Sequence, residues 1–143
     1  MKTKVMTLLV VLLLVGADVP KVDAVKEELK KFEGAWKLAS ANHDGNEATE
    51  EEVKSGSLVV TGNEFTLKVG NETHKGKFTL DPGKKPKTID VEFTEGTLKG
   101  SKVLGIYEME GNTRKSCFAA EDRPSDFAAG KGKYTWTWKR DKP

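Results

Sequence analysis

The feature of this sequence that most constrains its fold is a series of short runs, after Gly34, in which apolar and polar residues alternate. Phe65, Leu67 and Val69 alternate with polar neighbours, and residues 88–93 repeat the pattern. Successive side chains of a β-strand point to opposite faces, so each run predicts a strand with one buried face. We predict about eight strands from these runs, at residues 35–43, 57–61, 64–69, 72–80, 88–93, 103–110, 113–119 and 133–140.

Gly-Asn pairs separate neighbouring runs at residues 62–63, 70–71 and 111–112. Both residue types tolerate the positive φ of tight hairpin turns, so consecutive strands are expected to pair in an antiparallel meander. A meander leaves two unpaired edges unless it closes on itself. The sequence therefore predicts an all-β fold, a single eight-stranded antiparallel up-and-down barrel. A two-sheet sandwich is the alternative, and it would use 44–56 and 120–132 as its long connections.

The first residues have the pattern of a secretory signal peptide. Lys2 and Lys4 precede an apolar run that ends at the small residues Gly16 and Ala17. We expect cleavage after Ala17, with a weaker alternative site at residues 22–24. The run is shorter than the roughly 20 residues that a membrane-spanning helix needs. The mature chain is therefore expected to be exported, to the periplasm or the extracellular space, without membrane insertion.

We divide the chain into a signal peptide at residues 1–17, a segment with a short helix at 18–33, and the barrel domain at 34–141. Loss of the two leader lysines leaves 22 basic residues against 22 acidic ones. Nucleic-acid binding requires a surplus of positive charge, so it is not expected. Cys117 is the single cysteine, which excludes an intramolecular disulfide.

Segments at both ends of the barrel domain resemble lipocalins and fatty-acid-binding proteins. Gly34-Ala35-Trp36 resembles their Gly-x-Trp signature, and Arg140 follows the late aromatic residues Trp136 and Trp138. The resemblance implies a lipocalin-like barrel in which Arg140 stacks on Trp36. A guanidinium over an indole combines cation–π attraction with hydrogen bonds to nearby carbonyls. The expected closure of the narrow end of the barrel thus consists of Gly34, Trp36 and Arg140.

A second resemblance covers roughly residues 29–140. Gly34-x-Trp36 is followed in order by the segments 85–90, 105–111, Cys117 and 123–127. This order is similar to a family of small uncharacterised secreted proteins typical of planctomycetes, which implies the fold but no activity. One departure is Arg114, which stands where an apolar residue is expected, so the facing of strand 113–119 stays open.

The alternation predicts an aromatic interior. These six residues are the candidate ligand-binding lining: Trp36, Phe65, Phe93, Tyr107, Trp136 and Trp138. They either surround a pocket for a small apolar ligand or fill the barrel completely. The first hypothesis is an exported, non-catalytic ligand binder. The alternative is an interaction or inhibitory module of the cell envelope, with a filled core and a protein partner bound through loops 44–56 and 120–132.

An enzyme is the least favoured class, because no base, nucleophile and oxyanion donor can be assembled from the sequence. His43 and His74 lack the companions and spacing of metal ligands, so neither a metal nor another cofactor is expected. Cys117 is interpreted as a buried small apolar residue rather than a nucleophile. The acidic residues at 47 and 50–52 are interpreted as a solvated loop face.

Arg123 lies beside a proline in the long connection before the last strand. We interpret it as a loop clamp that bonds loop carbonyls or a carboxylate such as Asp126. Ligand binding by Arg123, in a loop folded over one end of the barrel, is the alternative.

Overall fold

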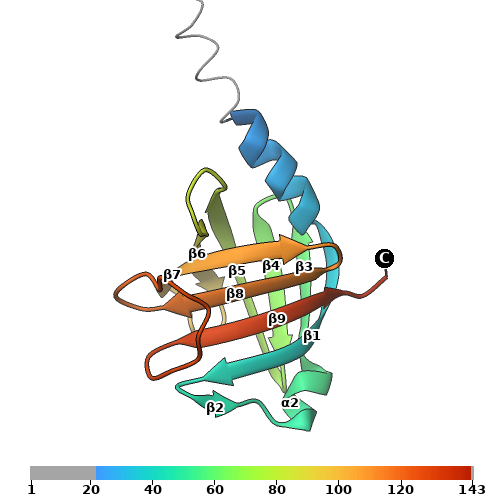
Figure 1. The fold of residues 1–143 in the computed structure, drawn as a ribbon. Coiled ribbons are helices and arrows are strands. Elements are labelled where there is room, and N and C mark those ends of the chain that lie inside the picture. Colours follow the sequence, from blue (N-terminus) through green and yellow to red (C-terminus); the bar gives the residue numbers. More distant parts are fainter. Residues whose placement is uncertain (1–21, 143) are drawn as a thin grey trace, which may run out of the picture.

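The chain closes into a β-barrel. A computed structural model describes residues 22–142, so the predicted signal peptide at 1–17 lies outside the described residues. Within residues 22–142, nine strands form one antiparallel sheet, and β1 pairs with β9 to close it (Figure 1). One of the nine, β2, is a two-residue strand beside β1, so eight strands make up the closed barrel. The predicted fold class, an eight-stranded antiparallel barrel preceded by a short helix, is confirmed.

The strands match the sequence-based boundaries to within two residues at every end. Their bounds are β1 (Gly34–His43), β2 (Asn46–Glu47), β3 (Ser57–Thr61), β4 (Glu64–Val69), β5 (Glu72–Asp81), β6 (Lys87–Glu95), β7 (Lys102–Glu110), β8 (Thr113–Ala119) and β9 (Tyr134–Arg140). The glycines of the three Gly-Asn turns have φ values near +60°. That conformation is nearly free of strain for glycine, which explains why these pairs define the hairpins.

The connection 44–56, predicted as a loop, contains β2 and a short helix, α2 (Glu50–Ser55). Thr49 is the N-cap of α2 and forms a capping box with Glu52: the Glu52 N–H donates to Thr49 Oγ1, and the Thr49 N–H donates to Glu52 Oε1. The exposed acidic residues 50–52 form the first turn, where the helix dipole favours negative charge. These residues are solvent-exposed, as expected, but 50–52 belong to the first turn of a helix rather than to a loop.

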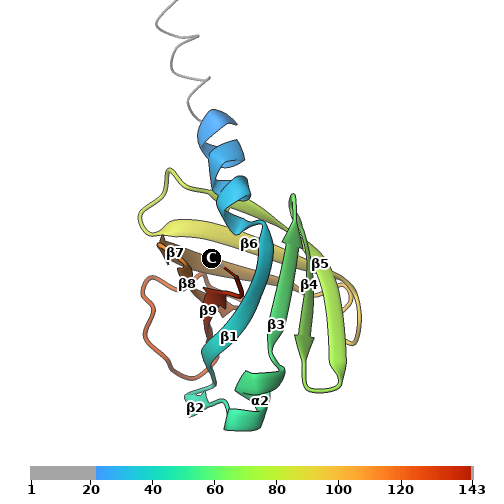
Figure 2. The same cartoon turned by 90° about the vertical axis from the view of Figure 1, so that its right-hand side faces the viewer.

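The helix at residues 22–32 stands at one end of the barrel, and α2 lies at the opposite end (Figures 1 and 2). Within the described residues, neither helix is long and apolar enough to cross a membrane. The helix end at Phe32 is almost completely buried, at 1% exposure, and joins the barrel core. The buried core cluster consists of Phe32, Trp36, Leu38, Leu58, Val60, Phe65, Phe78, Leu80, Ile89, Val91, Tyr107 and Trp138.

Candidate functional site

The helix-bearing end of the barrel is closed by an arginine and an indole. The Arg140 guanidinium carbon lies 4.3 Å from the Trp36 ring centroid. Arg140 also donates to the carbonyls of Lys31 and Glu33, both at 2.8 Å, and thereby binds the end of the helix. Gly34 has a φ of +113°, and a Cβ atom there would lie 3.3 Å from Arg140 Nη1. Glycine at this position thus permits both the turn into β1 and the close approach of the guanidinium.

A buried carboxylate attaches the helix to the barrel at the same end. Tyr107 Oη donates to Glu28 Oε2 at 2.6 Å, and Lys31 and Lys87 approach the carboxylate at 3.1 and 3.4 Å. Burial raises the pKa of Glu28, but the hydrogen bonds from Tyr107 and Lys31 and the two lysine charges outweigh it, so the pKa lies below its ordinary value. Burial and the adjacent Glu28 raise the pKa of Tyr107, which therefore remains a donor.

A cavity of about 680 Å³ occupies the interior of the barrel. Its floor includes Phe32, Tyr107 and Arg114, near the end that the helix covers. Its other end is bordered by Val69, at the end of β4, and by Leu98, which is 41% exposed in the β6–β7 loop. The cavity therefore runs along the barrel from a closed floor to a mouth on the α2 side.

Five of the six aromatic residues considered as a ligand lining do line this cavity: Phe65, Phe93, Tyr107, Trp136 and Trp138. Trp136 and Trp138 stack with centroids 5.7 Å apart, and Phe65 meets Phe93 edge-on at 5.7 Å. The sixth, Trp36, is not a lining residue. Its ring lies in the closure, where its Nε1 donates to the Phe32 carbonyl at 2.8 Å. The core is thus aromatic without being filled.

The structure settles the facing of β8, which the sequence left open. Arg114, Ser116 and Phe118 line the cavity, so this set of alternating residues points inward. Cys117 is on the outer face and is nevertheless fully buried. Burial raises the pKa of its thiol, and the charges of Lys133 and Asp126 have smaller, opposing effects on that pKa.

Arg123, in the β8–β9 connection, has other partners than the Asp126 carboxylate that the sequence suggested. Arg123 does not bond Asp126: its Nη1 donates to the Gly105 carbonyl at 2.8 Å and lies 2.7 Å from Asp90 Oδ1. Asp90 alternates with cavity-lining residues of β6, so Arg123 lies against the outer wall and not over an end of the barrel. Asp126 instead bonds the Ala128 N–H and Lys133, and both contacts lower its pKa. Arg123 fastens the connection to β6 and β7.

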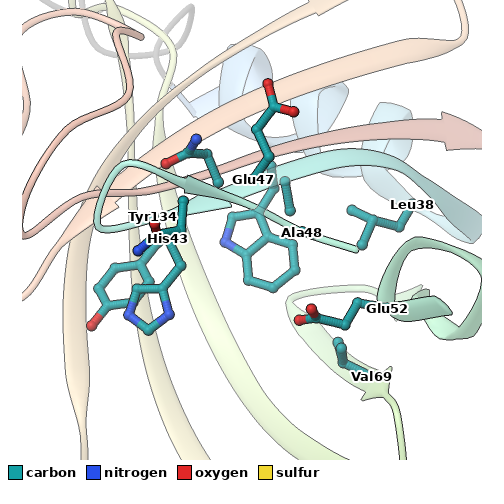
Figure 3. A pocket seen from close by; sticks show the side chains of 11 residues that line it. Leu38, His43, Glu47, Ala48, Glu52, Val69 and Tyr134 are labelled. Carbon is teal, nitrogen blue, oxygen red and sulfur yellow. The ribbon is translucent and has the colours of Figure 1, made fainter. Parts of the chain in front are cut away.

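A second hollow, of about 300 Å³, lies beside the cavity mouth where α2 and β2 meet β1. Figure 3 shows His43 and Tyr134 on one side of it and Glu52 with Val69 on the other. The ring centroids of His43 and Tyr134 are 4.3 Å apart, with the ring planes tilted by 32°. His43, Val69, Tyr134 and Trp136 line both hollows, so this one adjoins the mouth of the main cavity. The predicted contact loop 44–56 thus borders the mouth.

Within residues 22–142, no group of three or more His, Cys, Asp or Glu side chains is arranged to hold a metal ion. His74 faces the cavity and is buried, with its Nε2 atom 3.7 Å from a Glu72 carboxylate oxygen and Phe93 beside its ring. The described side chains thus offer a mainly apolar binding surface with a few polar anchors.

No protein-family model, curated protein or solved structure matches this chain. The resemblance to the planctomycete family therefore stays a prediction, and a function has to be argued from the geometry of the barrel.

Proposed function

We propose that this protein is an exported, non-catalytic barrel that binds a small, largely apolar molecule in its interior. The observation that carries the proposal is the cavity of about 680 Å³ with its mainly apolar and aromatic lining. Pockets for small molecules have this size and composition, with few polar groups among many apolar ones. An aromatic wall that is open at one end exposes apolar surface to water, and a ligand that covers it gains free energy in proportion to the area buried.

The closure at the other end supports the same function. The helix, Trp36 and Arg140 cover the floor, while the mouth on the α2 side is bordered by loops and hairpin turns. In this arrangement a ligand enters from the mouth on the α2 side.

The test is a titration with N-phenyl-1-naphthylamine, an uncharged probe whose fluorescence rises in apolar surroundings. We expect saturable binding, accompanied by a change in the emission of the lining residues Trp136 and Trp138. Ser116→Phe adds a ring on the inner face of β8 and should abolish binding. Lys115→Phe, which adds the same ring on the outer face, is the matched control and should bind normally.

Failure of the wild-type protein to bind the probe, or equal binding by the Ser116→Phe variant in a folded state, would refute the proposal. In that event the alternative, a partner protein bound through the connections 44–56 and 120–132, becomes the leading hypothesis.

A further inference from the structure

Arg114 is the charged residue at the floor of the cavity. It lies on the inner face of β8, opposite Trp138 of β9, and is 5% exposed. Its guanidinium carbon is 4.4 Å from the Phe32 ring centroid and 4.6 Å from that of Trp36. Both rings therefore form cation–π contacts with the guanidinium, and Arg114 also lines the cavity.

No carboxylate in residues 22–142 forms an ion pair with Arg114, and no hydrogen bond joins its side chain to another residue of that segment. The nearby buried carboxylate, Glu28, is already engaged by Tyr107, Lys31 and Lys87. Burial, together with the positive charge of Arg140, lowers the pKa of Arg114 to about 9, so the guanidinium is still protonated at neutral pH.

An unpaired buried cation is unfavourable, because desolvation of a charge costs several kcal/mol unless an opposite charge or hydrogen bonds compensate. The cation–π contacts with Phe32 and Trp36 offset part of this cost, but they provide no opposite charge. Ser116 follows two residues later on the same inner face and is also buried, so its hydroxyl lies on the same wall of the cavity as Arg114. The two residues give the cavity floor a polar character, below a mainly apolar wall.

We propose that the ligand is an amphipathic anion whose charged group binds Arg114 and Ser116 at the cavity floor and whose apolar chain extends toward the mouth. This inference rests on the proposed function and adds the chemical class of the ligand. A carboxylate or sulfate pairs with the planar fork of the guanidinium through two parallel hydrogen bonds. The chain then contacts the apolar residues of β4 and β6, among them Leu67, Val91 and Phe93.

The experiment compares dodecanoate with 1-dodecanol, which has the same chain and an uncharged end, by calorimetric titration of the full chain, because the helix with Phe32 forms part of the cavity floor. Hydrogen bonds to charged groups are strong enough that dodecanoate should bind at least about tenfold more tightly. Arg114→Met keeps the length and apolar stem of the side chain and should remove this preference while dodecanol binding persists. Lys115→Met removes the same charge from the outer face of β8 and should retain the preference.

Equal affinities of wild-type protein for the two compounds would overturn the assignment while leaving the proposed function intact. Binding of neither compound would overturn both. The comparison of dodecanoate with dodecanol on the wild-type protein tests the assignment even if Arg114→Met does not fold. Dodecyltrimethylammonium, which has the same chain and a positive charge, is titrated as a third compound. Tighter binding of that cation than of dodecanoate is a further result that contradicts the inference.

Discussion

Replacement of Tyr107 by phenylalanine isolates the contact that holds the N-terminal helix on the barrel. The substitution keeps the ring, which meets Phe32 edge-on at 5.1 Å, and removes the hydroxyl that donates to Glu28 Oε2 at 2.6 Å. The Glu28 side chain is 6% exposed, so water does not freely replace the lost donor. A hydrogen bond to a charged group contributes about 1.5–3 kcal/mol, and we expect the free energy of unfolding to fall by about 2 kcal/mol.

Urea unfolding at neutral pH, followed by far-ultraviolet circular dichroism, measures this loss. Tyr134→Phe is the matched control, because the Tyr134 ring packs against His43 and its hydroxyl bonds no other residue in the described part of the chain. The control should change the free energy of unfolding by less than about 0.5 kcal/mol.

The dependence on pH provides an independent check. The pKa of Glu28 is lower in the folded state, so its ionised form contributes stability above the unfolded pKa, and this contribution is lost as the pH falls through the folded pKa. The difference between wild type and Tyr107→Phe should therefore shrink between about pH 7 and about pH 3. A loss below about 0.5 kcal/mol at neutral pH, or one undiminished in acid, would refute the account of this contact.

Three further perturbations test other parts of the structure. Arg140→Met should lower the free energy of unfolding by about 1–2 kcal/mol, while Lys139→Met, on the outer face, should have little effect; equal losses in urea unfolding would argue against the closure. Thr49→Ala should lower the stability of α2 by about 1 kcal/mol and should speed amide hydrogen exchange in that helix. Unchanged exchange would contradict the role of Thr49 as N-cap. Arg123→Ala should accelerate the reaction of Cys117 with a thiol reagent, and an unchanged rate would show that the connection is held by other contacts.

The strands of the barrel were predictable because each one has a local signal. Alternating side chains mark the buried face, and glycine supplies the positive φ at the turns that follow Thr61, Val69 and Glu110. The resemblance at the two ends of the domain likewise led to Trp36 and Arg140, which the structure places in contact. By contrast, α2 was missed although Thr49 and Glu52 have the spacing of a capping box, since a helix of six residues is too short to show a hydrophobic periodicity.

The candidate site depended on contacts between distant segments, which no local pattern reports. Glu28 shares the apolar face of the helix with Leu29 and Phe32, and only the approach of Tyr107 from β7 explains its burial. Arg123 has several carboxylates near it in sequence, yet its partner is Asp90, 33 positions away in the chain.

Local patterns were enough to favour an antiparallel barrel over a two-sheet sandwich, because strand alternation and turn chemistry are properties of neighbouring residues. Which face of β8 points inward depended on the packed fold, because Arg114 and Cys117 give conflicting signals and Cys117 is buried although it is on the outer face. The tertiary structure also shows that the barrel interior is hollow. Sequence patterns do not reveal this, because the cavity volume is the small difference between the volume that the closed sheet encloses and the volume of the side chains inside it.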